Sequence, residues 1–347
     1  RADALAARAR ADAASQREAL QFRFLATVFM GAAARREDGS PLLAVDLIDR
    51  ARERLGDELG SESAARAQVE RMLGSVYLNA GRNAEAEAMY RAAAEHGSGH
   101  MPDGERAAYL REAARAAAFQ HRSAEALRLL DEAEQLLGPP PYDEGEAQTA
   151  TRILLTRILV HKDTDDPRYP DTVAQAARQV PGWLPADHPL LALILGEQAA
   201  MAEARGDYST LVAQRRAILD SFLRAGRSYP SDIGVQRMNL VRALALTGEH
   251  TEAREELQRA AEDLRRAYAN ADNAARARWL LQSARLYLDG PQPDPPAALT
   301  DAQAALAMLQ RLGEDARLSE LETAADAAQA AGAAESAREW LLQALAL

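Results

Sequence analysis

The sequence has no cysteine, a single lysine and few aromatic residues, and each scarcity narrows what the protein can be. Without cysteine, neither a disulfide framework nor a thiolate metal site can form. Cysteine content therefore does not distinguish an oxidising from a reducing compartment. Aromatic residues make up 5% of the 347 residues, runs of β-branched residues are few, and Ala, Leu, Arg and Glu are abundant. Because these abundant residues favour helices, the composition predicts an all-α fold.

Nucleic-acid binding and phosphoryl transfer are disfavoured by the charges and motifs. The formal net charge is −11, whereas nucleic-acid binding depends on neutralising phosphates with basic side chains. The only lysine, Lys162, falls in an expected loop, and no Gly-rich phosphate loop, HRD or DFG motif, dinucleotide fingerprint or nucleophile elbow occurs. We therefore expect a protein that is not an enzyme, with no cofactor and no nucleic-acid partner.

Metal binding is not expected either. His96 and His100 are four residues apart, but the glycines between them argue against a helix that would direct both rings at one ion. The loop that carries Asp163, Asp165 and Asp166 lacks the central glycine and terminal glutamate of a calcium loop. We interpret this loop as a solvated acidic turn, and the three tryptophans, 183, 279 and 340, as packing residues.

A recurring spacing is the most informative pattern that the sequence does contain. A turn residue is followed five residues later by alanine, four later by a bulky residue, and three later by a small one. The pattern occurs as Gly81, Ala86, Tyr90, Ala93, as His121, Ala126, Leu130, Ala133, as Gly248, Ala253, Leu257, Ala260, and as Gly332, Ala337, Leu341, Ala344. Such a period indicates helix pairs that must stack on their neighbours to bury their apolar faces.

Glycine and proline clusters divide the chain into the expected elements. Residues 1–62 are predicted to form an N-terminal stalk helix, a break at residues 35–41 and a capping helix. Residues 63–347 are predicted to form an array of about seven helix pairs, which cover residues 64–96, 105–137, 145–180, 188–225, 232–268, 272–312 and 316–345.

With the turn residue placed at position 15, the first pair matches the tetratricopeptide repeat at positions 7, 8, 11, 20, 24 and 27. These residues are Leu73, Gly74, Tyr77, Ala86, Tyr90 and Ala93, so the chain resembles the tetratricopeptide repeat family. The resemblance implies an α-solenoid with a right-handed superhelix and places Gly74 against Ala86. The fourth pair departs from the pattern because Arg215 stands at position 24.

The same resemblance implies a ligand-binding concave groove lined by the first helix of each pair. Its polar residues would be Gln68, Arg71, Asn79, Arg111, Arg115, Arg152, Asn239, Arg242, Gln282 and Arg285. Such a groove would favour a protein, a peptide or a small acidic ligand that bears carboxylate or phosphate. The alternative is an ordinary solvated face in which arginines pair within their own helix, as Arg111 and Arg115 can with Glu112.

A narrower resemblance covers residues 1–94. FLATVF (24–29), LIDRARERLGDEL (47–59) and the first repeat follow one another as in bacterial transmembrane serine/threonine kinases with a C-terminal tetratricopeptide domain. This resemblance implies a periplasmic sensor on a membrane-anchored parent, with signals relayed through the N-terminal helix, which could also form a homodimer. The alternative is a cytoplasmic scaffold, or the regulatory domain of a transcriptional activator.

Overall fold

The computed structural model describes residues 44–59, 63–224, 229–269 and 271–346, and this part of the chain contains fifteen α-helices and no strand. The predicted stalk helix and the break at residues 35–41 lie outside the described residues. The chain divides into two compact units, residues 1–184 and residues 185–347, which we call the N-terminal and C-terminal units. The all-α fold of stacked antiparallel helix pairs is confirmed.

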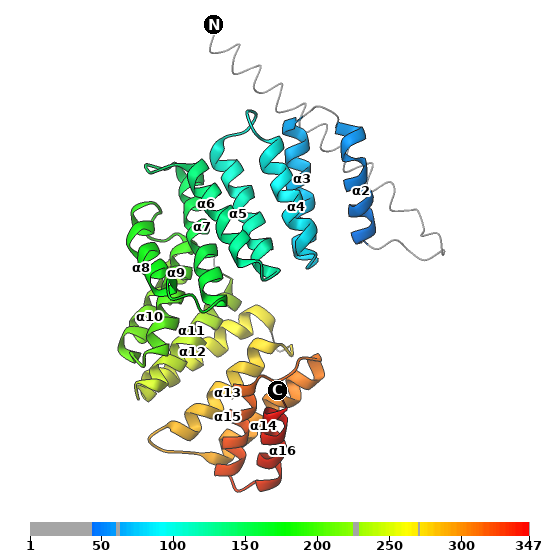
Figure 1. The fold of residues 1–347 in the computed structure, drawn as a ribbon. Coiled ribbons are helices and arrows are strands. Elements are labelled where there is room, and N and C mark those ends of the chain that lie inside the picture. The colour runs from blue at the N-terminus through cyan, green and yellow to red at the C-terminus, as the bar shows by residue number, and fades with distance from the viewer. Residues whose placement is uncertain (1–43, 60–62, 225–228, 270, 347) are drawn as a thin grey trace, which may run out of the picture. The chain divides into compact units, whose positions relative to one another are not determined.

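The described part of the N-terminal unit contains seven α-helices, in which α2 precedes three helix pairs (Figure 1). Within each pair the two helices pack against each other, and α4 and α6 also contact the first helix of the following pair. The helices are α2 (Ala44–Leu59), α3 (Ser63–Asn79), α4 (Asn83–His96), α5 (Asp103–Phe119), α6 (Ser123–Leu137), α7 (Glu144–Asp163) and α8 (Tyr169–Gln179).

The C-terminal unit contains the remaining four pairs. In this unit the first helices of neighbouring pairs lie side by side, α11 against α13 and α13 against α15. The helices are α9 (Pro189–Ala204), α10 (Tyr208–Arg224), α11 (Pro230–Leu246), α12 (His250–Tyr268), α13 (Ala274–Asp289), α14 (Pro295–Leu312), α15 (Leu318–Ala330) and α16 (Ala334–Leu345).

The turn is built in the same way in six of the seven pairs, and the exception is the turn between α13 and α14. Gly81 adopts φ 73°, and the N–H of the next residue, Arg82, donates to the Tyr77 carbonyl at 2.9 Å. This is a Schellman motif, in which a left-handed residue ends the helix and satisfies one of its last carbonyls. His121 holds the same position with φ 58°, a conformation that is unfavourable for a residue with a Cβ.

Small residues allow the two helices of a pair to approach closely. Ala86 and Ala93 are fully buried, and Tyr90 between them is 4% exposed. A Cβ at Gly74 would lie 3.1 Å from the ring of Tyr90, so the nearest neighbours of this position belong to Tyr90, and the expected contact with Ala86 stays a prediction. The glycine is needed because the aromatic ring at position 24 fills the space that a side chain at position 8 would occupy.

An ion pair links the residue after the turn to the second helix of the preceding pair. Arg122 follows His121, and its Nη1 donates to Oε2 of the buried Glu87 on α4 at 2.6 Å. Arg82 follows Gly81 and reaches Oδ2 of Asp49 on α2 at 2.7 Å in the same way. The helix α2 therefore packs on the first pair as the second helix of an earlier pair would.

Candidate functional site

Four of the predicted groove residues line one hollow in the C-terminal unit. Its volume is about 300 Å³, and helices α11, α13 and α15 form its walls. The predicted residues are Asn239 and Arg242 from α11, and Gln282 and Arg285 from α13. The remaining lining residues are Val241, Ala245, Arg278, Leu281, Leu286, Arg317, Ser319, Glu320 and Thr323. We call this hollow the α11–α13–α15 groove.

Three of the four arginines in this groove pair with carboxylates. Arg242 pairs with Glu203 on α9, whereas Arg285 bridges Asp289 at 2.7 Å and Asp326 of α15 at 2.8 Å. Burial lowers the pKa of Arg285, but the two aspartates outweigh burial and raise the pKa above its usual value. The groove is therefore crossed by ion pairs between neighbouring first helices, as well as by the pairs within one helix that the sequence suggested.

Arg278 is the third paired arginine, with Nε 3.2 Å from Oε1 of Glu320 and Nη2 3.5 Å from Glu314. Arg317 differs, because within the described chain no carboxylate lies within 4.0 Å of its guanidinium. Gln282 makes no hydrogen bond to the described residues, and its Oε1 is a buried acceptor without a donor. The groove thus contains one arginine side chain, Arg317, and one carboxamide, Gln282, that have no partner among the described residues.

The groove residues that the sequence argument missed are Arg278, Arg317, Ser319, Glu320 and Thr323. A signal for two of them was present. With Arg285 at position 9, Arg278 is at position 2, about two helical turns away on the same side of α13, and Ser319 holds position 2 of the last pair. Arg317 precedes α15, so helical periodicity could not have found it.

In the N-terminal unit, Gln68 and Arg71 join a polar cluster with α5. Nε2 of Gln68 and the hydroxyl of Tyr109 both donate to Oε1 of Glu105, at 2.8 and 2.6 Å, and Nε of Arg71 donates to Gln68 at 3.4 Å. Burial and the nearby Glu105 raise the pKa of Tyr109. Asn79 is exposed at the end of α3 and belongs to no cluster described here.

Arg111, Arg115 and Arg152 are close enough to influence one another, and Arg111 lies deeper than a groove residue is expected to lie, so its predicted role in ligand binding stays a prediction. The Arg111 side chain is 8% exposed and pairs with Glu112, its neighbour in the chain, at 2.8 Å. Burial lowers the pKa of Arg111, and the like charges of Arg115 and Arg152 act in the same direction. Arg115 and Arg152 remain accessible. The periodicity identified the helix face but not the depth at which this side chain lies.

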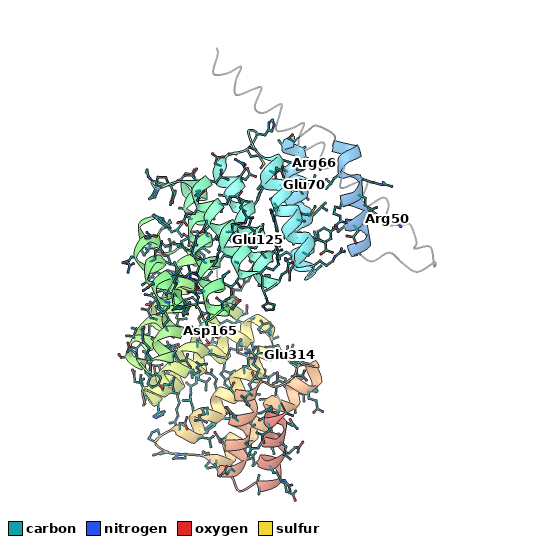
Figure 2. All side chains as sticks on the ribbon, in the orientation of Figure 1. Arg50, Arg66, Glu70, Glu125, Asp165 and Glu314 are labelled. Carbon is teal, nitrogen blue, oxygen red and sulfur yellow. The ribbon has the colours of Figure 1, made fainter. Side chains whose placement is uncertain are left out.

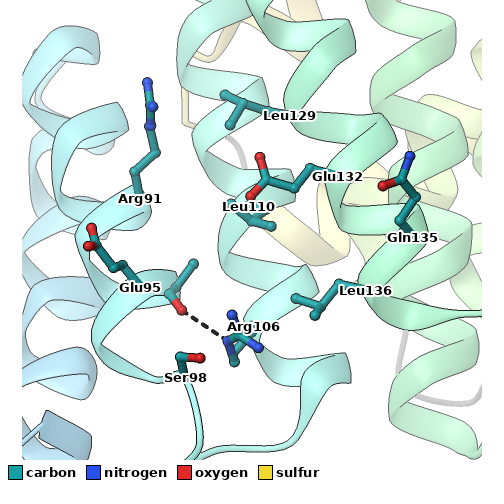
Figure 3. A pocket seen from close by; sticks show the side chains of 10 residues that line it. Arg91, Glu95, Ser98, Arg106, Leu110, Leu129, Glu132, Gln135 and Leu136 are labelled. Carbon is teal, nitrogen blue, oxygen red and sulfur yellow. Dashed lines mark hydrogen bonds between the residues drawn. The ribbon is translucent and has the colours of Figure 1, made fainter.

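A larger hollow of about 550 Å³ lies between α4, α5 and α6 in the N-terminal unit, and none of the predicted residues lines it (Figure 3). Its apolar wall includes Leu110, Leu129 and Leu136. Charges of both signs surround it, with Arg91 and Glu95 on α4 and Arg106 and Glu132 on the other helices, beside the neutral Gln135. This mixture does not favour ligands of one charge.

The residues considered for metal binding have other contacts. His96 Nδ1 lies 2.8 Å from Oε2 of Glu70, whose other oxygen pairs with Arg66, and Figure 2 labels this pair on α3. Asp166 pairs with Arg168 at 2.6 Å, and this interaction lowers the pKa of the Asp166 carboxyl. Among the described residues no group of three His, Cys, Asp or Glu side chains could hold a metal ion.

The tryptophans have packing roles where the structure shows their contacts. Trp279 donates from Nε1 to the Leu257 carbonyl at 2.9 Å, and Trp183 stacks edge to face on Tyr142 with ring centres 5.2 Å apart. Trp340 packs against the core cluster of α13 and α14. In the described part of the chain, no helix combines the length and the apolar character that a membrane span requires.

Comparison with known proteins supports the fold. No family model matches the chain, and no curated protein matches it. Among solved structures, the apo form of RapI is similar at 12% identity with a TM-score of 0.62, covering 87% of this chain and 79% of RapI. BtubC (BKLC) from P. vanneervenii is similar at 15% identity with a TM-score of 0.52, covering 65% of this chain and 89% of BtubC.

At these identities the likeness defines a class by fold alone. The chain is a tetratricopeptide-like, all-helical repeat protein similar in architecture to Rap proteins and BtubC.

Proposed function

We propose that this protein is a non-catalytic scaffold or regulator that binds an acidic, extended peptide segment of a partner in the α11–α13–α15 groove. The observation that supports the proposal is the combination of Arg317 and Gln282 in one groove, both without a partner among the described residues. Arginine binds carboxylates through its fork of N–H donors, and a carboxamide can both donate to and accept from a peptide backbone.

The neighbouring side chains fit the same ligand. Asn239, Ser319 and Thr323 supply further polar groups along the groove, and Leu281 and Leu286 supply apolar surface. Turning the Gln282 amide breaks no hydrogen bond with the described residues, and a backbone N–H of the peptide would satisfy its acceptor. The paired arginines can exchange an aspartate for a carboxylate of the ligand, so binding would cost little net desolvation.

The test is fluorescence anisotropy with a labelled (Glu-Ala)5 peptide, and a (Gln-Ala)5 peptide serves as the uncharged control. Arg317→Gln removes a charge-assisted hydrogen bond, so it should weaken binding roughly tenfold, and Gln282→Leu should weaken it severalfold. Arg265→Gln on α12 is the matched control, because Arg265 is exposed and lies outside the groove. Equal affinities of the Arg317 and Arg265 variants would contradict the proposal.

Salt provides a second measurement. Binding of the acidic peptide should weaken as ionic strength rises from about 0.01 to 0.15 M, because the Debye length falls from about 30 to about 8 Å. Binding that ignores salt would point to an apolar contact instead. The same purified protein should neither hydrolyse ATP nor phosphorylate a protein, and activity that survives further purification would overturn the non-catalytic assignment.

The finer hypothesis of a periplasmic sensor on a membrane serine/threonine kinase rests on the resemblance of residues 1–94. Residues 1–43, which hold FLATVF and the proposed relay helix, lie outside the described part of the chain. We favour the scaffold or regulatory domain as the simpler proposal, because the groove requires no kinase. Fractionation of cells that produce the natural protein would separate a periplasmic from a cytoplasmic location.

A further inference from the structure

We propose that Arg111, Arg115 and Arg152 in the N-terminal unit form a second binding site, specific for a dianionic phosphate group. This site is independent of the α11–α13–α15 groove, because every residue that forms it belongs to α3, α4, α5 or α7. The inference depends on an imbalance of charge, on the burial of one guanidinium, and on donors that have no acceptor.

The charges of the cluster do not balance. The charged groups with the largest effects on Arg111 are Glu112, Arg115 and Arg152, so among these groups three cations, Arg111 included, face one carboxylate. Glu112 lies 2.8 Å from Arg111 through Oε1 and 3.0 Å from Arg115 through Oε2. Within the described residues, no carboxylate lies within 4.0 Å of the Arg152 guanidinium. The cluster therefore carries an excess of two positive charges, which a phosphate dianion would neutralise.

Burial makes this excess costly. Arg111 is more than nine-tenths buried, and a buried charge is tolerated only when it is paired and hydrogen-bonded. The Nε atoms of both Arg111 and Arg115 are buried without a hydrogen-bond partner. The contact of Arg115 with Oε2 of Glu112 is close in distance but lacks hydrogen-bond geometry. Two arginine donors are thus without an acceptor among the described residues.

Neutral donors lie beside the same charges. The charged groups that act on Tyr90 include Glu112, Arg115 and Arg111. Burial raises the pKa of the Tyr90 hydroxyl, and Ser75 on α3 lies close enough to act against this rise. Phosphate has oxygens enough to accept from several guanidinium and hydroxyl groups at once, and arginine is the residue best suited to bind it. Arg115 and Arg152 are accessible, so a phosphate group can reach the cluster from solvent.

The experiment titrates inorganic phosphate into the full chain at constant ionic strength, with chloride as the balancing anion, and follows binding by calorimetry and the melting temperature. We expect saturable binding, weakened about tenfold or more by Arg115→Gln and by Arg152→Gln, since each removes a charge-assisted hydrogen bond. Arg128→Gln on α6 is the matched control, because Arg128 is half exposed and pairs with Glu125 and Glu132. Its affinity should equal that of the natural protein.

Glu112→Gln should strengthen the response to phosphate, whereas the arginine variants weaken it. This variant therefore separates the proposal from a purely structural role. Removing the only carboxylate raises the excess charge to three, so this variant should melt at a lower temperature without phosphate and regain more stability when phosphate is added. A phosphoserine peptide that binds more tightly than inorganic phosphate would identify a phosphoprotein as the source of the group. Tighter binding of the inorganic ion would identify a free phosphate.

Two results would overturn the proposal. One is the absence of saturable phosphate binding. The other is a rise in melting temperature for Arg115→Gln and Arg152→Gln with no difference in phosphate response from Arg128→Gln, since the cluster would then be repulsive only. The acidic-peptide assay uses variants in the C-terminal unit, so failure of one proposal is distinguishable from failure of the other.

Discussion

Replacing Gly74 with leucine tests the packing on which the repeat depends. A Cβ at this position would lie 3.1 Å from three atoms of the Tyr90 ring, closer than ordinary van der Waals contact. The ring is 4% exposed, so it cannot move outward without losing buried contacts. Overpacking of this kind costs roughly 1–3 kcal/mol, whereas replacing glycine within a helix gains about 0.8–1 kcal/mol of helix propensity.

The net effect of Gly74→Leu should be a destabilisation of up to about 2 kcal/mol after the propensity gain. Gly196 on α9 is the matched control, because nothing lies within 4 Å of a Cβ built there. Gly196→Leu should keep the gain of roughly 0.8–1 kcal/mol. Urea unfolding followed by far-ultraviolet circular dichroism measures both variants, and hydrogen exchange on α3 and α4 locates the change within the N-terminal unit.

Two further variants refine this test. In Gly74→Ala the Tyr90 ring must yield by only a few tenths of an ångström, so the free energy of unfolding should change by less than about 1 kcal/mol. In Gly74→Leu combined with Tyr90→Leu the ring is absent, and part of the lost stability should return. The packing argument is wrong if Gly74→Leu and Gly196→Leu change the free energy of unfolding by the same amount.

Three other predictions follow from local features. His121→Gly should raise the free energy of unfolding by up to about 1 kcal/mol in urea titrations, because it relieves the left-handed conformation of a residue with a Cβ; a loss would contradict this. Arg215→Leu should raise the melting temperature, because burial lowers the pKa of Arg215 and the equivalent Leu130 and Leu257 are buried; an unchanged value would show that the arginine is fully solvated. Burial also lowers the pKa of His161, so as the pH falls this histidine binds a proton more readily in the unfolded chain than in the folded one. The free energy of unfolding should therefore fall as the pH drops below about 6.5, and His161→Gln should make it depend less on pH in this range.

The sequence predicted the helices well because their ends are determined locally. The turn glycines at positions 81, 206, 248 and 332 all adopt positive φ, and the helix boundaries fall within about two residues of the expected ones. The proline-rich segment at residues 289–296 spans the turn between α13, which ends at Asp289, and α14, which begins at Pro295. Propensity, capping and chain reversal act over a few residues, so a single sequence contains the information.

The site was only partly predictable, because burial depends on contacts between distant residues. Arg111 and Arg242 both follow the repeat pattern and both face neighbouring first helices. Yet Arg111 is buried beside Arg115 and Arg152, whereas Arg242 is 57% exposed and paired with Glu203. Repeat position sets the direction of a side chain on its helix. The residues that the adjacent helices place around it set its depth and its partner.

The ion pairs between repeats show why charge is a poor guide to ligands in such a protein unless each partner is known. Glu87 is buried and contacts Arg122, the residue after the next turn, at 2.6 Å. In the C-terminal unit the two charges exchange places, because the arginine, Arg216, is on the second helix and the carboxylate, Glu249, follows the turn, 3.1 Å apart. Either arrangement joins neighbouring pairs, so these arginines serve the stacking of helices. An arginine is a stronger indication of a ligand where the fold leaves it without a carboxylate, as at Arg152 and Arg317.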